Sequence, residues 1–155
     1  MKLLCSVFVL LLAKGAVAAD FPAHELRQAG RPAEAAAASF AGKDVYPPQM
    51  LADKAFRKAY HRALGESRRE RWLARLEGPG VPVRPVRIGG GEYRLVAACK
   101  AHDCYENNLV VVFAPASGRL LGKVLQSERP PYFIGDPDGA EQAELDRLWR
   151  EEWRP

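Results

Sequence analysis

Two cysteines, Cys99 and Cys104, enclose the part of the sequence with the richest chemistry, because Lys100, His102 and Asp103 lie between them. Paired cysteines can form a disulfide, bind a metal as thiolates or carry out redox reactions. A histidine beside a reduced cysteine can also serve as the base of a nucleophilic site. The choice depends on whether the two thiols stay reduced, and the compartment of the protein decides that.

The first 19 residues have the layout of a secretory signal peptide. Lys2 gives a positive start, residues 3–12 are an apolar run, and residues 16–19 are small residues suited to cleavage. The apolar run is shorter than the roughly 20 residues that a membrane-spanning helix needs. We therefore expect cleavage of residues 1–19, a periplasmic location without membrane attachment, and a single domain over residues 20–155.

Export would leave Cys99 and Cys104 as the only cysteines, because Cys5 is removed with the signal. Two cysteines in an oxidising compartment are expected to pair. The spacing is longer than the Cys-x-x-Cys of redox centres, and a disulfide removes the thiolates that a metal site or a nucleophile would need. The sequence therefore favours a disulfide-closed loop, with no metal, no cofactor and no catalytic residue. The redox and metal hypotheses require accessible thiols.

Net charge gives little reason to expect a nucleic-acid partner. Removing Lys2 and Lys14 lowers the formal charge from +4 to +2. The basic cluster at residues 68–71 is short, includes an acidic residue and has no aromatic residues interleaved, which is typical of a solvated helix face.

Helical periodicity dominates the first half of the chain. The composition of residues 33–40 predicts a short helix there. Apolar residues at steps of three and four predict an amphipathic helix over 49–64, ended by Gly65. Further helical turns are predicted over 67–76.

Strand periodicity then takes over. Strands are predicted over residues 81–88, 92–99, 109–114 and 119–125. The first contains Pro82 and Pro85, which lack a backbone N–H, so it is predicted to lie at the edge of the sheet. Pro130 and Pro131 predict a break in the chain, with a short final strand over 132–134.

The chain is predicted to end in a helix capped by Asp138 and Glu141, with Leu145, Leu148, Trp149 and Trp153 in one apolar stripe. Short connections between strands favour an antiparallel meander. The predicted fold class is thus α+β, an antiparallel sheet meander with helices packed on one face.

Because Cys99 ends one predicted strand and the next begins shortly after Cys104, the six residues 99–104 are expected at the tip of a β-hairpin. A ring this small adds only about 2 kcal/mol of stability in the loop-entropy model. Its main effect is to fix the shape of the loop, which suits a recognition element. From chemistry alone, however, a short disulfide at the end of a hairpin is more often a structural staple than a recognition loop.

The loop resembles that of the Ivy family, the bacterial inhibitors of vertebrate lysozyme, which carries Cys-Lys-Pro-His-Asp-Cys. Here Cys99, Lys100, His102, Asp103 and Cys104 match, and Ala101 replaces the proline. The likeness covers about residues 51–127, including the strands on either side of the loop (93–98 and 109–113) and two helical segments (54–56 and 72–73).

The resemblance implies an inhibitor of C-type lysozyme that protects peptidoglycan and performs no chemistry. The loop residues Lys100, Ala101, His102 and Asp103 would enter the cleft, with His102 between the two catalytic carboxylates. Lys100 would add positive charge, and Asp103 would orient His102 or the loop backbone, or pair with a basic residue of the enzyme.

Two departures leave alternatives open. Losing the proline at Ala101 weakens preorganisation by about 0.4–1 kcal/mol. Animal lysozymes of this type are generally basic, so a mature chain of charge +2 would not be steered to them. Other muramidases, the endogenous lytic transglycosylases, or a role as an envelope binding or structural module therefore remain alternatives. Family members can also form homodimers.

Overall fold

A computed structural model describes residues 44–154. The expected signal segment over residues 1–19 and the expected helix over 33–40 lie outside the described residues. The elements follow in the order α2 (Pro47–Met50), α3 (Lys54–Leu64), the 3₁₀ helix η2 (Gly65–Arg69), α4 (Arg71–Arg75), β1 (Arg84–Ile88), β2 (Gly91–Cys99), β3 (Asn108–Ala114), β4 (Arg119–Gln126), β5 (Arg129–Ile134) and α5 (Gly139–Trp153).

The helix predicted over residues 49–64 is two helices, because Asp53 starts a new one. Its carboxylate accepts hydrogen bonds from the backbone N–H groups of Ala55 (2.8 Å) and Phe56 (3.2 Å), which makes Asp53 the N-cap of α3. Gly65 ends α3 as predicted. Its φ of 51° is a backbone conformation that residues other than glycine rarely adopt. The further turns predicted after it form η2 and α4.

The five strands form one antiparallel sheet in the order β1-β2-β3-β4-β5, which confirms the predicted meander. β3 is central and all its residues are buried. β1 is an edge strand, as Pro82 and Pro85 indicate. The other edge, β5, includes Pro130 and Pro131, where the sequence predicts a break. An edge strand accepts proline because one side of its backbone has no neighbouring strand to bond.

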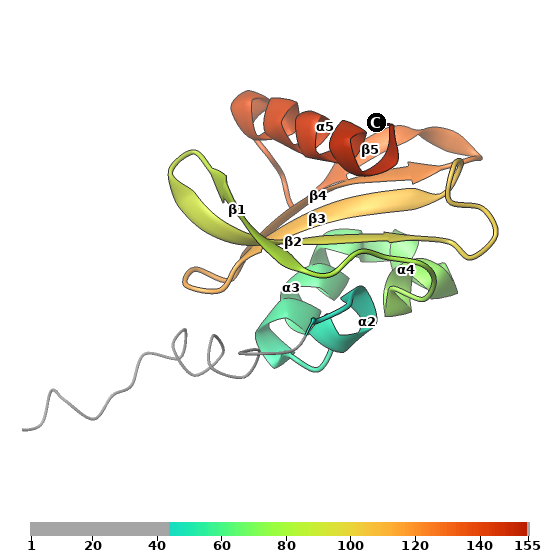
Figure 1. Cartoon of the computed structure of the whole chain (residues 1–155), viewed down its shortest axis with the longest axis horizontal. Helices are drawn as coiled ribbons and strands as arrows, with labels where there is room; N and C mark the ends of the chain where they lie inside the picture. Colours follow the sequence, from blue (N-terminus) through green and yellow to red (C-terminus); the bar gives the residue numbers. More distant parts are fainter. Residues whose placement is uncertain (1–43, 155) are drawn as a thin grey trace, which may run out of the picture. The chain divides into compact units, whose positions relative to one another are not determined.

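The α+β class is confirmed, but helices cover both faces of the sheet, so the prediction of helices on one face is wrong (Figure 1). On one face, Phe56 of α3 packs edge-to-face on Phe113 of β3, with ring centroids 5.4 Å apart. On the other face, Leu145 and Leu148 of α5 are buried. The physical reason is that, beyond Asn108 at its start, both the odd and the even residues of β3 are apolar, and a sheet that is apolar on both faces needs cover on both sides.

The N-terminus of α5 has the predicted capping box. Asp138 accepts a hydrogen bond from the backbone N–H of Glu141 (2.8 Å), and the Glu141 carboxylate accepts one from the backbone N–H of Asp138 (2.9 Å). Trp149 and Trp153 pack against the cluster beneath the helix, so the predicted stripe belongs to the core.

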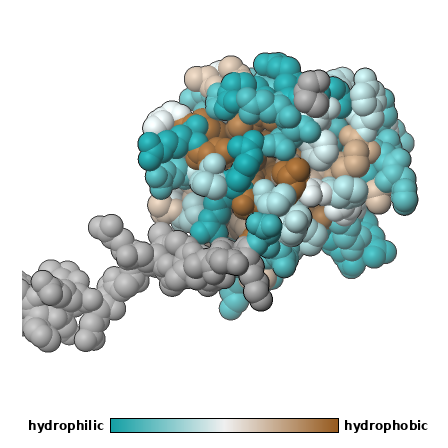
Figure 2. Space-filling model, in the orientation of Figure 1, coloured by the Kyte–Doolittle hydropathy of each residue, from teal (hydrophilic) through white to brown (hydrophobic). Residues whose placement is uncertain are grey.

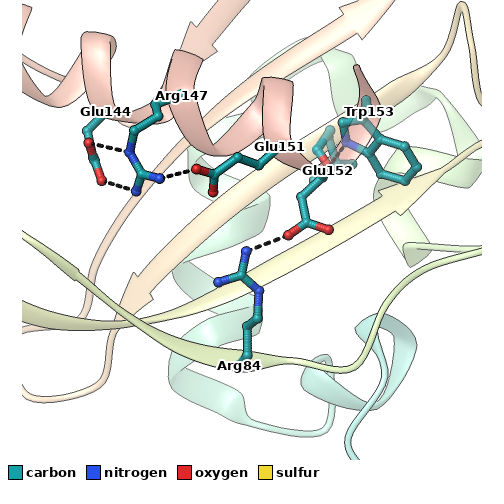
Figure 3. A network of polar contacts seen from close by, with 7 residues as sticks. Arg84, Glu144, Arg147, Glu151, Glu152 and Trp153 are labelled. Atoms are coloured by element: carbon teal, nitrogen blue, oxygen red, sulfur yellow. Dashed lines mark hydrogen bonds and ion pairs between the residues drawn. The ribbon is translucent and has the colours of Figure 1, made fainter. Parts of the chain in front are cut away.

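An ion pair joins the C-terminal half of α5 to the edge strand β1 (Figure 3). Arg84 of β1 and Glu152 of α5 are 2.6 Å apart, and the Glu152 side chain is only 11% exposed. Arg147 pairs within the helix with Glu144 and Glu151, and such exposed pairs contribute only about 0.3–0.5 kcal/mol each. The Arg84–Glu152 pair therefore does more to fix how α5 lies across the sheet.

The surface seen in Figure 2 is mostly hydrophilic, and apolar side chains show between α5 and the strands. Within residues 44–154, none of the helices combines the length and the apolar character needed to span a bilayer.

Candidate functional site

The two cysteines lie where the β2–β3 hairpin opens into its loop. Cys99 is the last residue of β2 and pairs with Asn108, the first residue of β3. The disulfide to Cys104 is formed, with the two Cα atoms 4.8 Å apart, inside the usual range for such bonds. Because Cys99 is fully buried, the bond ties the loop to the interior of the sheet.

The residues at the tip of the loop face solvent. Lys100, Ala101 and His102 are all exposed, and the carbonyl of Lys100 accepts a hydrogen bond from the backbone N–H of Asp103 at 3.0 Å. His102 has a φ of 64°, the left-handed conformation that few residues other than glycine adopt. Such a conformation persists only where the surrounding structure holds it. The closed loop therefore presents the imidazole of His102 outward in a fixed backbone conformation.

Asp103 braces the loop from within. Its carboxylate accepts a hydrogen bond from the side-chain amide of Asn107 at 2.6 Å, and its carbonyl accepts one from the Asn107 backbone at 2.9 Å. Asn107 in turn accepts a hydrogen bond from the backbone N–H of Ser127, after β4. The sequence suggests several roles for Asp103. These hydrogen bonds fit one of them, in which Asp103 orients the backbone of the loop.

Asn108 links the loop to α5 and is a residue that sequence reasoning missed. Its buried side-chain amide donates to the carbonyl of Cys104 at 2.7 Å. Its amide oxygen accepts from the indole N–H of Trp149 at 2.6 Å. The sequence feature that could have pointed to Asn108 is the pair Asn107-Asn108 directly before an apolar strand. Polar side chains that are buried at the start of such a strand need hydrogen-bond partners.

Gly78 supports the loop from the other side of β2. Its φ is 137°, and a Cβ at this position would lie 2.0 Å from the carbonyl oxygen of Cys99. Pro79 follows, and its carbonyl accepts the backbone N–H of Cys99 at 2.9 Å. The sequence indicates only a chain break at residues 78–80, whereas the structure shows a segment packed against the base of the loop.

A polar groove flanks the loop on the side of η2. Lys100 and Asn107 contribute to its walls, and charges of both signs from η2 and the β4–β5 turn complete them. These charged residues are Glu66, Arg69, Glu70, Glu128 and Arg129. Because the signs alternate, the groove has no strong preference for a cation or an anion.

The disulfide limits the chemistry that the two cysteines can carry out. Both sulfurs of Cys99 and Cys104 are used in the disulfide, so neither is a thiolate nucleophile or metal ligand. Over residues 44–154, no group of three or more His, Cys, Asp or Glu side chains lies together in a way that could hold a metal ion. The site is a disulfide-closed loop with an exposed histidine, built on a sheet whose two faces are both covered.

Comparison with known proteins matches most of the described part of the chain to a defined family. The family model described as "Inhibitor of vertebrate lysozyme (Ivy)" matches residues 55–153, more than half of the chain. A protein of Pseudomonas aeruginosa named Inhibitor of vertebrate lysozyme is 32% identical over 66 residues, which make up 42% of this chain and 43% of that protein. The aligned segment thus spans less than half the length of this relative.

Proposed function

Because the chain belongs to the Ivy family of inhibitors of vertebrate lysozyme, we propose that it is a periplasmic inhibitor of C-type lysozyme that acts through its disulfide-closed loop. The observation that carries the proposal is the presentation of His102. The imidazole is exposed at the tip of a loop whose base is covalently closed and buried. A binding residue held this way loses little conformational entropy when it meets a partner.

The proposed mechanism is occupation of the catalytic cleft. A C-type lysozyme is a retaining glycosidase with two carboxyl groups on either side of the scissile bond. The imidazole of His102 has a nitrogen on each side of its ring, and in its protonated form it donates a hydrogen bond from each. Placed between the two carboxyl groups, His102 blocks both the general acid and the nucleophile. Lys100 adds positive charge beside an acidic cleft.

Hydrogen bonds within the loop support the proposal at Ala101, where the sequence departs from the family pattern. Ala101 stands in place of a proline, which costs about 0.4–1 kcal/mol of preorganisation. The hydrogen bonds of Asp103 to Asn107 and of Cys104 to Asn108 hold the loop backbone on either side of the disulfide. These contacts offset the freedom that alanine restores.

The test is a titration of a vertebrate C-type lysozyme with wild-type protein and with His102→Ala, following lysis of a peptidoglycan substrate. We expect the wild type to inhibit and His102→Ala to bind at least about 30-fold more weakly, as for a central interface residue. His61→Ala is the matched control, because His61 lies on α3 and contacts the carbonyl of Ala74 within the fold. If lysis is the same with wild type, variant and no protein at micromolar concentration, the proposal is wrong.

The charge of the chain favours a second candidate target. After loss of the signal its formal charge is +2, which gives no long-range attraction to a basic lysozyme. An endogenous lytic transglycosylase would be an alternative muramidase-like partner for the same loop. Inhibition of such an enzyme by wild type but not by His102→Ala, without inhibition of vertebrate lysozyme, would identify it. A third outcome would identify the loop as a structural staple of an envelope module. In that case His102→Ala binds the same partners as the wild type, and the only effect of the double variant Cys99→Ala, Cys104→Ala is a lower free energy of unfolding.

We also propose that residues 1–19 are removed on export, leaving one domain. The apolar run and the small residues that follow it support this, as does the disulfide, which needs an oxidising compartment. The intact mass of the exported protein measures both cleavage and the disulfide at once.

A further inference from the structure

A second side chain beside the loop is conspicuously exposed. Tyr105 follows Cys104 directly and is 69% exposed. Among residues 44–154 the other exposed large hydrophobic side chain is Tyr46, at 44%. A single exposed aromatic residue is common on protein surfaces and by itself indicates nothing. What distinguishes Tyr105 is how it is held.

Arg154, just after α5, fixes Tyr105 in place. Its guanidinium carbon lies 4.0 Å from the centre of the Tyr105 ring, and its Nη2 donates to the Tyr105 carbonyl at 2.7 Å. The same guanidinium lies 5.0 Å from the Trp149 ring. The Tyr105 ring is therefore stacked on a cation that is itself packed on α5, and the exposure of Tyr105 leaves much of the ring open to solvent.

The two flanks of the loop are chemically different. The flank on the side of η2 is the polar groove, with charges of both signs. The flank on the side of α5 presents the ring of Tyr105 and the guanidinium of Arg154. Tyrosine and arginine are residue types enriched among those that contribute most to protein interfaces. Tyrosine supplies a large rigid contact area at low entropic cost, and less still when it is already oriented.

We propose that Tyr105 is a second anchor in the complex with the lysozyme that the loop enters, and that Arg154 is its positioning residue. This inference rests on the proposed function. With His102 in the cleft, Tyr105 lies only three residues away along a braced loop, so its exposed ring meets the rim of the same cleft. Packing against the wall of a cleft shaped for sugar rings fits a flat side chain with an apolar body.

The first experiment compares the inhibition constants of single variants against a vertebrate C-type lysozyme. We expect Tyr105→Ala to weaken inhibition about tenfold, and Tyr105→Phe to stay within about twofold of wild type because it keeps the ring. Tyr46→Ala is the matched control, since it removes the other exposed tyrosine and should leave inhibition unchanged. Thermal melting of each variant separates loss of contact from loss of fold.

The second experiment tests the positioning role by a double-mutant cycle. Arg154→Ala should weaken inhibition several-fold on its own but add almost nothing in the Tyr105→Ala background, because its effect passes through the ring. Arg154→Lys should restore part of the loss by keeping the cation beneath the ring. Equal effects of Arg154→Ala with and without Tyr105 would overturn the positioning role.

A third measurement reads the contact directly. Chemical nitration of the free protein should modify both Tyr46 and Tyr105, whereas the complex should protect Tyr105 and leave Tyr46 reactive. Wild-type inhibition, with loss on His102→Ala but none on Tyr105→Ala, would overturn the inference and leave the proposed function intact. An absence of inhibition or binding by the wild type would instead overturn the proposed function, and this inference with it.

Discussion

The connection between the loop and α5 leads to a quantitative prediction for Asn108→Ala. The side chain of Asn108 is fully buried and makes two short hydrogen bonds, to the carbonyl of Cys104 and from the indole N–H of Trp149. Alanine removes both bonds and leaves the two partners without them. The backbone pairing with Cys99 across the hairpin remains available to alanine.

The magnitude follows from these contacts. Each lost hydrogen bond contributes about 1 kcal/mol net, and an inward polar group left without a partner adds about 1–3 kcal/mol. We therefore expect Asn108→Ala to lower the free energy of unfolding by about 3–5 kcal/mol, a large share of the roughly 5–15 kcal/mol that holds a typical domain together. Inhibition should weaken as well, because the Cys104 carbonyl at the base of the loop is released.

Urea unfolding followed by tryptophan fluorescence measures this change, and Trp149→Phe completes a double-mutant cycle. If Asn108 and Trp149 act as one unit, the two substitutions together should cost less than the sum of the single ones by at least about 0.5 kcal/mol. A loss under about 0.5 kcal/mol for Asn108→Ala, the size of an ordinary surface substitution, would refute the reasoning.

Two other predictions concern the segment beneath the loop and the helix layer. Gly78→Ala should lower the free energy of unfolding by more than about 3 kcal/mol and weaken inhibition, because the new Cβ would lie 2.0 Å from the Cys99 carbonyl oxygen. Gly118→Ala, at a left-handed φ of 68° but with open space around the new Cβ, should lose only about 1–2 kcal/mol in the same urea assay. Burial raises the pKa of Tyr60 above its ordinary value, so the folded state keeps a proton that the unfolded state releases, and stability should fall as the pH rises above about 10. Tyr60→Phe should lower the free energy of unfolding by about 1 kcal/mol at neutral pH, because the hydrogen bond to the Leu73 carbonyl is lost, but it should also flatten the alkaline decline in stability. If the curves of stability against pH for the wild type and Tyr60→Phe run parallel, Tyr60 is not the group that causes this decline.

Local patterns were enough to predict most of the elements. The spacing of apolar residues, which differs between helices and strands, located α3, β2, β3, β4 and α5. The capping residues Asp138 and Glu141 located the start of α5. The residues of the candidate site were predictable for the same reason. Cys99 and Cys104 are five positions apart, and a hairpin brings such neighbours together whatever the rest of the fold does.

The sequence by itself thus determined the strand meander, the closed loop and the exposure of His102, because each follows from contacts between residues close together in the chain. Only the tertiary structure decided that α5 covers the second face of the sheet, and with it the contacts of Trp149 with Asn108 and of Arg154 with Tyr105. These pairs are 41 and 49 residues apart. Their meeting depends on which way the chain crosses the sheet after β5, and a periodic pattern that marks a helix face as apolar does not say which apolar surface it will cover.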